Sequence, residues 1–519
     1  MFFRLQAEVT GTEIARDEYL QRLKDRMWNR RIKVVTGIRR CGKSYLLFNI
    51  FRRHLLSEGV PEGNIIGIAL DDFYCSHLRD ARALLDEIMS RASDPDGRYY
   101  VLIDEIQMVP GFGEVMNTLV RHDRLDVYVT GSNSKGLSSD IRTEYRGRGD
   151  EVRVHPLSFA EFSSAYAGGD AWLEYCTYGG MPETVSMRTA EQKQQYLGDL
   201  MRNIYMADMQ ERHDIRMPDE LSIVTDVLCS SVGSLTNPLK LSNTLRTEYR
   251  SGIADDTVNR YLGILEDSYL FERARRFDVK ARKELGSPVK YYAEDVGLRN
   301  ARLGFADLDM PHIMENIVYS ELRRRGFQVS VGVVEVRVPE DGASRSVRLE
   351  VDFVAVLGDR RYYVQSAYAV PDGAKREQEK RPFRAIRDGY RKVLVVGHDL
   401  PPHLDSDGVL NIGIRQFLLD PGSLDRRAED ARPTPPHPAC RTSRVAPPPR
   451  LCTSRASSLI YSGPQKAPKR HLRRGRAGKP PPPMSYACPT TSDKFYIPCR
   501  TSSEQQAGRD GKALSLAKG

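Results

Sequence analysis

The stretch Gly37-Ile38-Arg39-Arg40-Cys41-Gly42-Lys43-Ser44 decides the fold of the first part of this chain. It matches the phosphate-loop pattern G-x-x-x-x-G-K-[ST], and it lies between an apolar stretch predicted as a strand and a predicted helix. The glycines let the backbone curl around phosphate oxygens, and the positive end of the helix dipole favours the same anion. We therefore expect the whole stretch to bind ATP, with Lys43 at the β- and γ-phosphates and the Ser44 hydroxyl on Mg²⁺.

A second motif, Tyr99-Tyr100-Val101-Leu102-Ile103-Asp104-Glu105, is an apolar strand that ends in two acidic residues. Downstream of a complete phosphate loop, this pattern predicts that Asp104 holds the magnesium ion. Glu105 is then expected to polarise the water that attacks the γ-phosphate. The two motifs together predict ATP hydrolysis.

Two further sites are predicted around the next strand. Ser132 and Asn133 follow that strand and suit a polar sensor of the γ-phosphate or of the attacking water, with Thr130 behind them; a simple turn is the alternative. Arg146 and Arg148 precede another short strand, where many ring-forming ATPases place an arginine that reaches the γ-phosphate of a neighbouring copy. Arg148 is the candidate, and a solvated loop arginine is the alternative.

Strands and helices alternate from about Arg31 to Glu161. The expected strands are Ile32–Thr36, Asn64–Leu70, Tyr99–Ile103, Asp126–Thr130 and Glu151–His155, and the expected helices are Lys43–His54, Ala81–Ala92 and Gly111–Arg121. This alternation predicts an α/β domain with a parallel sheet. The pattern then becomes mainly helical up to about Phe277, and α/β character returns from about His312 to Leu419.

With these motifs the chain resembles the AAA-type ATP-binding proteins of prokaryotes that carry a C-terminal domain of unknown function. The resemblance covers Glu18 to Asp420. Besides the two motifs above, it rests on Thr130-Gly131-Ser132-Asn133-Ser134, Pro156-Leu157-Ser158-Phe159-Ala160-Glu161-Phe162, Tyr178-Gly179-Gly180-Met181-Pro182-Glu183, Tyr291-Tyr292-Ala293-Glu294-Asp295-Val296-Gly297-Leu298-Arg299-Asn300 and Glu350-Val351-Asp352-Phe353-Val354. We expect an AAA-type ATPase domain at 18–165, a helical lid and winged-helix-like region at 166–285, a restriction-endonuclease-like domain at 286–420 and a tail at 421–519.

The tail differs sharply in composition from the rest of the chain. Residues 421–519 contain 16 of the 30 prolines and carry a net charge of +13, whereas the preceding residues carry −4. Without periodic apolar residues, such a segment is expected to be disordered. Because the basic charge belongs to the tail, the overall charge of +9 gives no argument that the folded part binds nucleic acid.

Other whole-chain features concern the compartment. No apolar run is long enough to cross a membrane, and the N-terminus lacks the apolar stretch of a signal peptide, so we expect a cytosolic protein. The eight cysteines form no C-x-x-C pair, which favours free thiols over a zinc site.

Two regions have a weaker resemblance to known modules. Leu241–Phe271 resembles a winged helix, but its second helix begins with Asp255 and Asp256, which would repel DNA phosphates. A packing or partner-binding role is therefore favoured over DNA readout. Glu315–Tyr368 resembles a restriction-endonuclease-like core, with Glu315 or Glu321 as the helix acid.

In that nuclease-like core Asp352 would be the strand aspartate. Gln365 and Ala367 stand where the fold has an acid and a lysine, and Lys375 or Lys380 could replace that lysine only from another element. Since Gln cannot supply the negative charge that Mg²⁺ prefers, an inactive nuclease-like domain is favoured.

The main hypothesis is an ATPase whose nucleotide state changes how the C-terminal part meets a protein partner. The protein itself is a candidate homo-oligomer. An ATP-dependent DNA-binding enzyme or nuclease is the alternative, and a nucleotide-binding scaffold with negligible turnover is a third.

Overall fold

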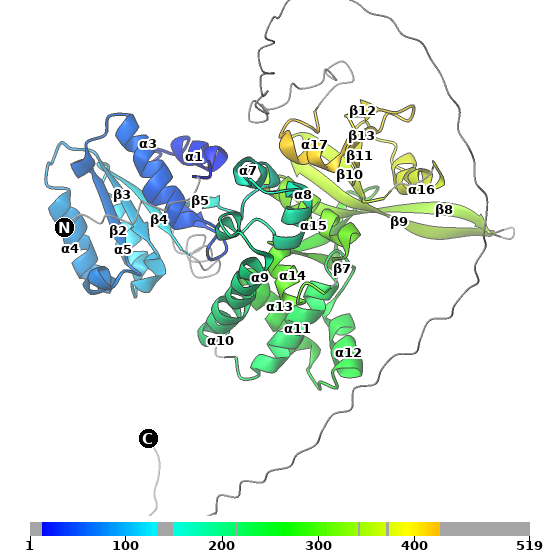
Figure 1. Cartoon of the computed structure of the whole chain (residues 1–519), viewed down its shortest axis with the longest axis horizontal. Helices are drawn as coiled ribbons and strands as arrows, with labels where there is room; N and C mark the ends of the chain where they lie inside the picture. Colours follow the sequence, from blue (N-terminus) through cyan, green and yellow to red (C-terminus); the bar gives the residue numbers. More distant parts are fainter. Residues whose placement is uncertain are drawn as a thin grey trace, which may run out of the picture. The chain divides into compact units, whose positions relative to one another are not determined.

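The first sheet is built from five strands in the regions that the sequence predicts as strands (Figure 1). This computed structural model describes residues 13–131, 149–213, 215–306, 308–340, 343–369 and 373–425. The five strands are β1 (Ile32–Thr36), β2 (Ile65–Ala69), β3 (Tyr99–Asp104), β4 (Leu125–Thr130) and β5 (Gly149–Arg153). All of them pair in parallel, in the order β2-β3-β4-β1-β5. The predicted parallel α/β sheet is confirmed, and its carboxyl edge brings the ends of β1, β3 and β4 together.

Helices cover both faces of this sheet. The side chains of its central strands alternate between the two faces, and on each face they pack into a separate apolar cluster with the helices. The helices and short turns are α1 (Asp17–Lys24), α2 (Lys43–Tyr45), η1 (Leu46–Phe51), α3 (Arg52–Ser57), η2 (Glu62–Asn64), η3 (Phe73–Arg79), α4 (Ala81–Arg91), η4 (Ile106–Met108) and α5 (Phe112–Leu119). Val101 and Ile103 of β3 pack with α4 and α5, whereas Tyr100 and Leu102 pack with α1 and α3 (Figure 1). Since α2, η1 and α3 follow one another without a break, a single helical run begins at the phosphate loop.

The middle of the chain is helical, as predicted. Its elements are α7 (Phe159–Ala165), α8 (Ala171–Tyr178), η5 (Pro182–Val185), α9 (Ala190–Asp199), η6 (Leu200–Met206), α10 (Ala207–Arg212), α11 (Pro218–Ser230), α12 (Pro238–Glu248) and α13 (Asp255–Asp267). Val258, Tyr261, Leu262 and Leu265 of α13 are all buried, as their helical spacing predicts.

The C-terminal part contains a second, mixed sheet. Its strands are β6 (Phe271–Asp278), β7 (Lys283–Ala293), β8 (Gln328–Glu340), β9 (Ala343–Leu357), β10 (Arg360–Ala367), β11 (Arg391–Val396), β12 (His403–Leu404) and β13 (Leu410–Gly413), and its helices are α14 (Val296–Arg302), α15 (Met310–Arg324), α16 (Gly373–Arg384) and α17 (Ile414–Leu419). The strand order is β12-β13-β11-β10-β9-β8-β6-β7. The strands and the helix predicted around Asp352 are found in β9, β10 and α15.

Two of the expected boundaries fall within packed structure. The antiparallel hairpin β6–β7 follows α12 and α13, which is the order expected for a winged helix. However, β6 also pairs with β8. The boundary expected after residue 285 therefore lies inside a strand of the second sheet. Ser423 and Leu424 are 0% and 2% exposed, so packed structure continues beyond the boundary expected after Asp420. The winged-helix and nuclease-like identities stay predictions.

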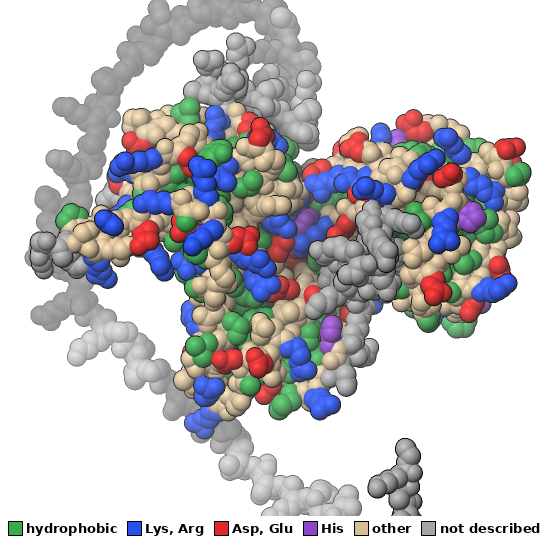
Figure 2. Space-filling model, turned by 180° about the vertical axis from the view of Figure 1, so that it is seen from behind, with side chains coloured by type: hydrophobic (Ala, Val, Ile, Leu, Met, Phe, Trp, Pro, Cys, Tyr) green, Lys and Arg blue, Asp and Glu red, His purple; other side chains and the backbone are tan. Residues whose placement is uncertain are grey.

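In the residues described, no helix has the length and apolar character needed to cross a membrane. Charged side chains of both signs are interspersed over the described part of the face in Figure 2. The cysteines of this part, Cys41, Cys75, Cys176 and Cys229, are free and buried.

Candidate nucleotide site

The phosphate loop curls tightly between β1 and α2. Gly37 has a φ of +139°, and a Cβ at this position would lie 2.1 Å from the carbonyl oxygen of Val154. Gly42 precedes α2 with a φ of +98°, a value that side-chain-bearing residues rarely adopt. Inside the curve, Lys43 Nζ donates hydrogen bonds to the carbonyl oxygens of Gly37 and Ile38, each at 3.0 Å. The loop thus holds the Lys43 ammonium group inside its curve, at the carboxyl edge of the sheet.

Asp104 and Glu105 lie at the same edge, at the end of β3. The Asp104 carboxylate is buried and accepts hydrogen bonds from the hydroxyls of Ser44 and Thr130. Burial raises the pKa of Asp104 above its usual value, although these two hydroxyls oppose the shift. The Thr130 hydroxyl in turn accepts a hydrogen bond of 3.0 Å from the Glu105 N–H. The structure therefore brings together Ser44, Asp104 and Glu105, which the sequence places in two separate motifs.

These residues fit a magnesium ion bound together with nucleotide phosphates. Mg²⁺ takes oxygen ligands and is usually held by one or two carboxylates, waters and substrate phosphates. Ser44 and Asp104 supply a hydroxyl and a carboxylate in hydrogen-bond contact. Glu105 has a φ of +51°, an uncommon backbone conformation for a residue with a side chain. It lines the cavity next to the phosphate loop, where Gln107 donates a hydrogen bond to its carboxylate.

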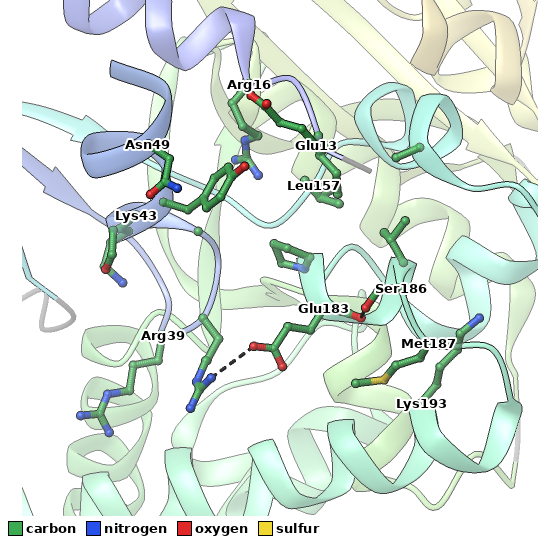
Figure 3. A pocket seen from close by; sticks show the side chains of 18 of the residues that line it. Glu13, Arg16, Arg39, Lys43, Asn49, Leu157, Glu183, Ser186, Met187 and Lys193 are labelled. Carbon is green, nitrogen blue, oxygen red and sulfur yellow. Dashed lines mark hydrogen bonds and ion pairs between the residues drawn. The ribbon is translucent and has the colours of Figure 1, made fainter. Parts of the chain in front are cut away.

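A cavity of about 1830 Å³ opens over the phosphate loop. Figure 3 shows Lys43 and Arg39 on one side of it, Met187 and Lys193 on the other, and Glu183 between them. The volume exceeds the roughly 300–1,000 Å³ that is typical of small-molecule pockets. A nucleotide can therefore occupy the end at the phosphate loop, and the cavity still extends to the helical middle region.

Side chains from the helical region bind the middle of the phosphate loop, which the motif alone did not predict. Arg39 pairs with Asp208 at 3.2 Å, and its carbonyl oxygen accepts a hydrogen bond of 2.7 Å from the Tyr205 hydroxyl. Arg40 pairs with Glu183 at 3.2 Å. Ser132, Asn133, Arg146 and Arg148 lie outside the residues that the structure describes, so their roles stay predictions.

Comparison with known proteins identifies the family. Residues 29–163 match the family described as AAA domain, and residues 169–309 match a domain of unknown function (DUF8612). A protein of Haemophilus influenzae is 33% identical over 413 residues, which cover 78% of this chain and 98% of that protein. The chain belongs to the same family as this protein. Its N-terminal part is a P-loop ATPase domain of the AAA type.

The chain is also similar to a more distant relative and to solved structures. A protein of Methanocaldococcus jannaschii is 28% identical over 376 residues, which cover 69% of this chain and 79% of that protein. Among solved structures, the chain is similar to the Aeropyrum pernix ORC1 protein in complex with DNA, at 13% identity and a TM-score of 0.28, over 58% of this chain and 95% of that chain. A structural likeness at this TM-score adds nothing about the function of this AAA-domain protein.

A second polar cluster lies in the C-terminal sheet around Asp352. Glu315 lies beside Asp352, and Lys290 Nζ is 3.0 Å from the carboxylate of Glu315 and 2.7 Å from that of Glu350. The ammonium group of Lys290 thus pairs with Glu315, one of the two carboxylates predicted as the helix acid of a nuclease site, and with Glu350. Lys290 could not be found from the Asp352 motif because it lies on β7, far along the chain from that motif.

Two other residues weighed for a nuclease site, Glu321 and Lys380, are paired elsewhere, whereas Gln365 accepts a hydrogen bond of 3.3 Å from the Asp352 N–H. Glu321 pairs with Arg324 and Arg325 at 2.8 and 2.7 Å, and Lys380 pairs with Asp405. Across the described ranges, no group of three or more His, Cys, Asp or Glu side chains is arranged to hold a metal ion. These pairings give no support to an active nuclease site around Asp352.

Proposed function

We propose that this AAA-domain protein binds ATP with Mg²⁺ at the phosphate loop, hydrolyses it, and uses the nucleotide state to change how its C-terminal part meets a protein partner. The observation that carries the catalytic part is the grouping of Ser44, Asp104 and Glu105 beside Lys43. Phosphoryl transfer depends mainly on positioning and on stabilisation of charge, and these residues supply both at one edge of the sheet.

Each residue has a separate task in this proposal. The loop N–H groups and Lys43 bind the phosphate oxygens, and Ser44 and Asp104 hold the magnesium ion. When bound, the ion neutralises charge that develops on the phosphate oxygens. The Glu105 carboxylate orients the attacking water and accepts its proton, while Thr130 fixes the backbone at Glu105 through its hydroxyl.

The test separates binding from turnover. Glu105→Gln is expected to keep ATP affinity but to lower turnover at least about a hundredfold, the range usual for a general base. Lys43→Ala is expected to weaken ATP binding itself. Both are measured as steady-state ATPase rates and as the dissociation constant for ATP. Glu114→Gln on α5, an exposed residue away from the cavity, is the matched control. A wild-type turnover rate in Glu105→Gln would remove Glu105 from this role.

The switch part of the proposal is supported by the contacts that join the phosphate loop to the helical region. Arg148 of a neighbouring copy is proposed to complete the site if the protein assembles.

The same ATPase assay with added DNA tests the alternative of a DNA enzyme. We expect no cleavage of plasmid or linear DNA with Mg²⁺ or Mn²⁺, with or without ATP. Cleavage that disappears in Asp352→Ala would favour the alternative.

A further inference from the structure

Glu294 and Asp295 form a buried acidic pair between the last residue of β7 and the first residue of α14. Neither residue lines the cavity above the phosphate loop. Both are at least nine-tenths buried, yet their carboxylates reach in different directions. Each carboxylate holds a different segment that packs on the loop.

Glu294 holds the segment that follows β5. Its carboxylate lies 2.6 Å from the guanidinium of Arg153 and 2.7 Å from Nδ1 of His155. Although burial would raise the pKa of Glu294, the charge of Arg153 and the contact with His155 keep it below its usual value. Glu294 is therefore the anionic partner of two residues that flank Val154.

Val154 is the point at which this segment touches the phosphate loop. Its N–H donates to the Thr36 carbonyl oxygen at 2.8 Å, and its own carbonyl oxygen accepts a hydrogen bond of 3.3 Å from the Cys41 thiol. The same carbonyl oxygen lies so close to Gly37 that no Cβ fits there. A shift of Val154 would therefore move both the start of the loop and Cys41.

Asp295 holds the segment that precedes η5. One carboxylate oxygen accepts a hydrogen bond of 2.7 Å from the Gly180 N–H, and the other accepts one of 3.1 Å from the Leu298 N–H, which caps α14. Burial raises the pKa of Asp295 to about 6, against the effect of these N–H donors. Asp295 therefore fixes Gly180 to the first turn of α14.

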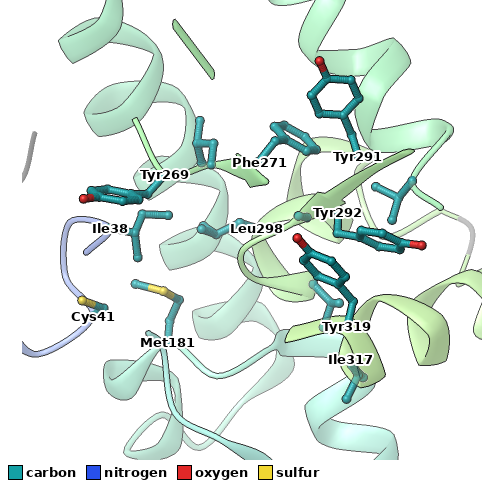
Figure 4. Packing of buried hydrophobic residues seen from close by; sticks show 14 of the residues in the cluster. Ile38, Cys41, Met181, Tyr269, Phe271, Tyr291, Tyr292, Leu298, Ile317 and Tyr319 are labelled. Carbon is teal, nitrogen blue, oxygen red and sulfur yellow. The ribbon is translucent and has the colours of Figure 1, made fainter. Parts of the chain in front are cut away.

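The residues that follow Gly180 touch the middle of the phosphate loop. Met181 is buried in the same apolar cluster as Ile38 and Cys41, and Figure 4 shows these three side chains together. Glu183 pairs with Arg40 at the rim of the cavity. Together with the Val154 contacts, this second segment contacts the loop at residues between Gly37 and Cys41.

We propose that Glu294 and Asp295 are positioning residues of the ATPase site, which hold the phosphate loop through Val154 and Met181 and so couple the nucleotide to β7 and α14. This inference rests on the proposed function, because it names the contacts through which the nucleotide state reaches the C-terminal part. Since neither carboxylate lines the cavity, both act through Val154 and Met181, the residues that touch the loop.

The first test uses the full-length chain with Glu294→Gln and Asp295→Asn. An amide in place of Asp295 turns an N–H donor toward Gly180 or Leu298, and Glu294→Gln removes the charge beside Arg153. Each variant is expected to raise the dissociation constant for ATP by about tenfold, the factor that one lost hydrogen bond to a charged group gives. Asp405→Asn is the control, because it breaks the ion pair between Asp405 and Lys380 of α16, and neither residue lines the cavity. That control should lower the melting temperature but leave ATP affinity within about twofold.

The second test does not depend on the folding of Glu294→Gln or Asp295→Asn. In the wild-type chain, saturating ATP should slow amide hydrogen exchange at the loop and also in peptides spanning 178–183 and 294–300. Lys43→Ala, which weakens ATP binding, should show neither effect. Slower exchange confined to the loop, or folded Glu294→Gln and Asp295→Asn proteins with wild-type ATP affinity, would overturn the inference. Absence of ATP hydrolysis in the wild type would instead count against the proposed function, since binding and exchange would still test the coupling.

Discussion

At the scale of single residues, Gly37 shows why the loop sequence tolerates little change. A side chain there would meet the Val154 carbonyl oxygen at 2.1 Å, and the backbone is already at a φ of +139°. Gly37→Ala is expected to add roughly 1–3 kcal/mol of backbone strain besides this clash, and to weaken ATP binding strongly. The measurement is ATP affinity alongside the melting temperature. Gly63→Ala is the matched control, because nothing lies within 4 Å of a Cβ at Gly63; equal behaviour of the two variants would contradict the prediction.

Glu272 predicts a pH dependence of stability. Its carboxylate lies 3.0 Å from Arg153 and 2.7 Å from Arg323. Burial opposes ionisation, but these two guanidinium groups lower the pKa of Glu272 to about 2. A carboxyl whose pKa is lower in the folded state stabilises the fold above its ordinary pKa of 4.5 and loses that contribution as the pH falls toward 2.

Glu272→Gln is therefore expected to cost about 3 kcal/mol near pH 7, as a pKa difference of this size implies. The difference in melting temperature between the two proteins should narrow as the pH falls from about 4.5. Thermal unfolding of the wild type and of Glu272→Gln, at pH values from neutral down to the acid range, measures this difference in melting temperature. A constant difference at every pH would show that packing, and not the charge, is responsible.

At the scale of elements, β8 and β9 form an arm that extends beyond the rest of the second sheet (Figure 1). β6 pairs with β8 only as far as Val333, and β10 pairs with β9 from Phe353 onward. The outer residues of the two strands pair only with one another, up to Glu340 and Ala343. A two-stranded ribbon by itself is marginally stable in water, so this arm adds little to the stability of the fold.

Replacing residues 338–345 by Asn-Gly should keep the pair Arg337–Ser346 and close the shortened hairpin with a tight turn. The expected change in stability is within about 1 kcal/mol, with unchanged ATPase activity. Phe353→Ala, which truncates a fully buried side chain of the same hairpin, should cost about 3–5 kcal/mol. Loss of ATPase activity on shortening the arm would show that the arm supports the nucleotide site.

At the scale of the whole chain, packed structure continues beyond Asp420, where the change in composition suggests a boundary. The Leu424 side chain is buried, its carbonyl oxygen accepts a hydrogen bond of 2.9 Å from Arg391, and Ser423 contacts Arg325 at 3.1 Å. Truncation after Asp425 is expected to leave the melting temperature and the ATPase rate unchanged. Truncation after Asp420 should cost about 1.5–3 kcal/mol, the value of one buried leucine. Equal melting temperatures for the two truncated proteins would contradict this assignment.

The sequence by itself determined the ATPase sheet, the phosphate loop and the acidic pair Asp104–Glu105. These features depend on short-range patterns, namely apolar strands of a few residues and a loop whose glycines must directly adjoin a helix. Their position at one sheet edge follows because parallel strands end on the same side. Local pattern was therefore sufficient to group Ser44 with Asp104.

Only the tertiary structure decided how this site is held and what surrounds Asp352. The contact of Glu294 with Arg153 joins residues 141 positions apart, and that of Asp295 with Gly180 joins residues 115 apart. Lys290 reaches Glu315 and Glu350 from a separate strand. Such contacts arise when buried charges must find partners wherever the folded chain brings them. Because the partners share no short-range pattern, nothing in the local sequence identifies them.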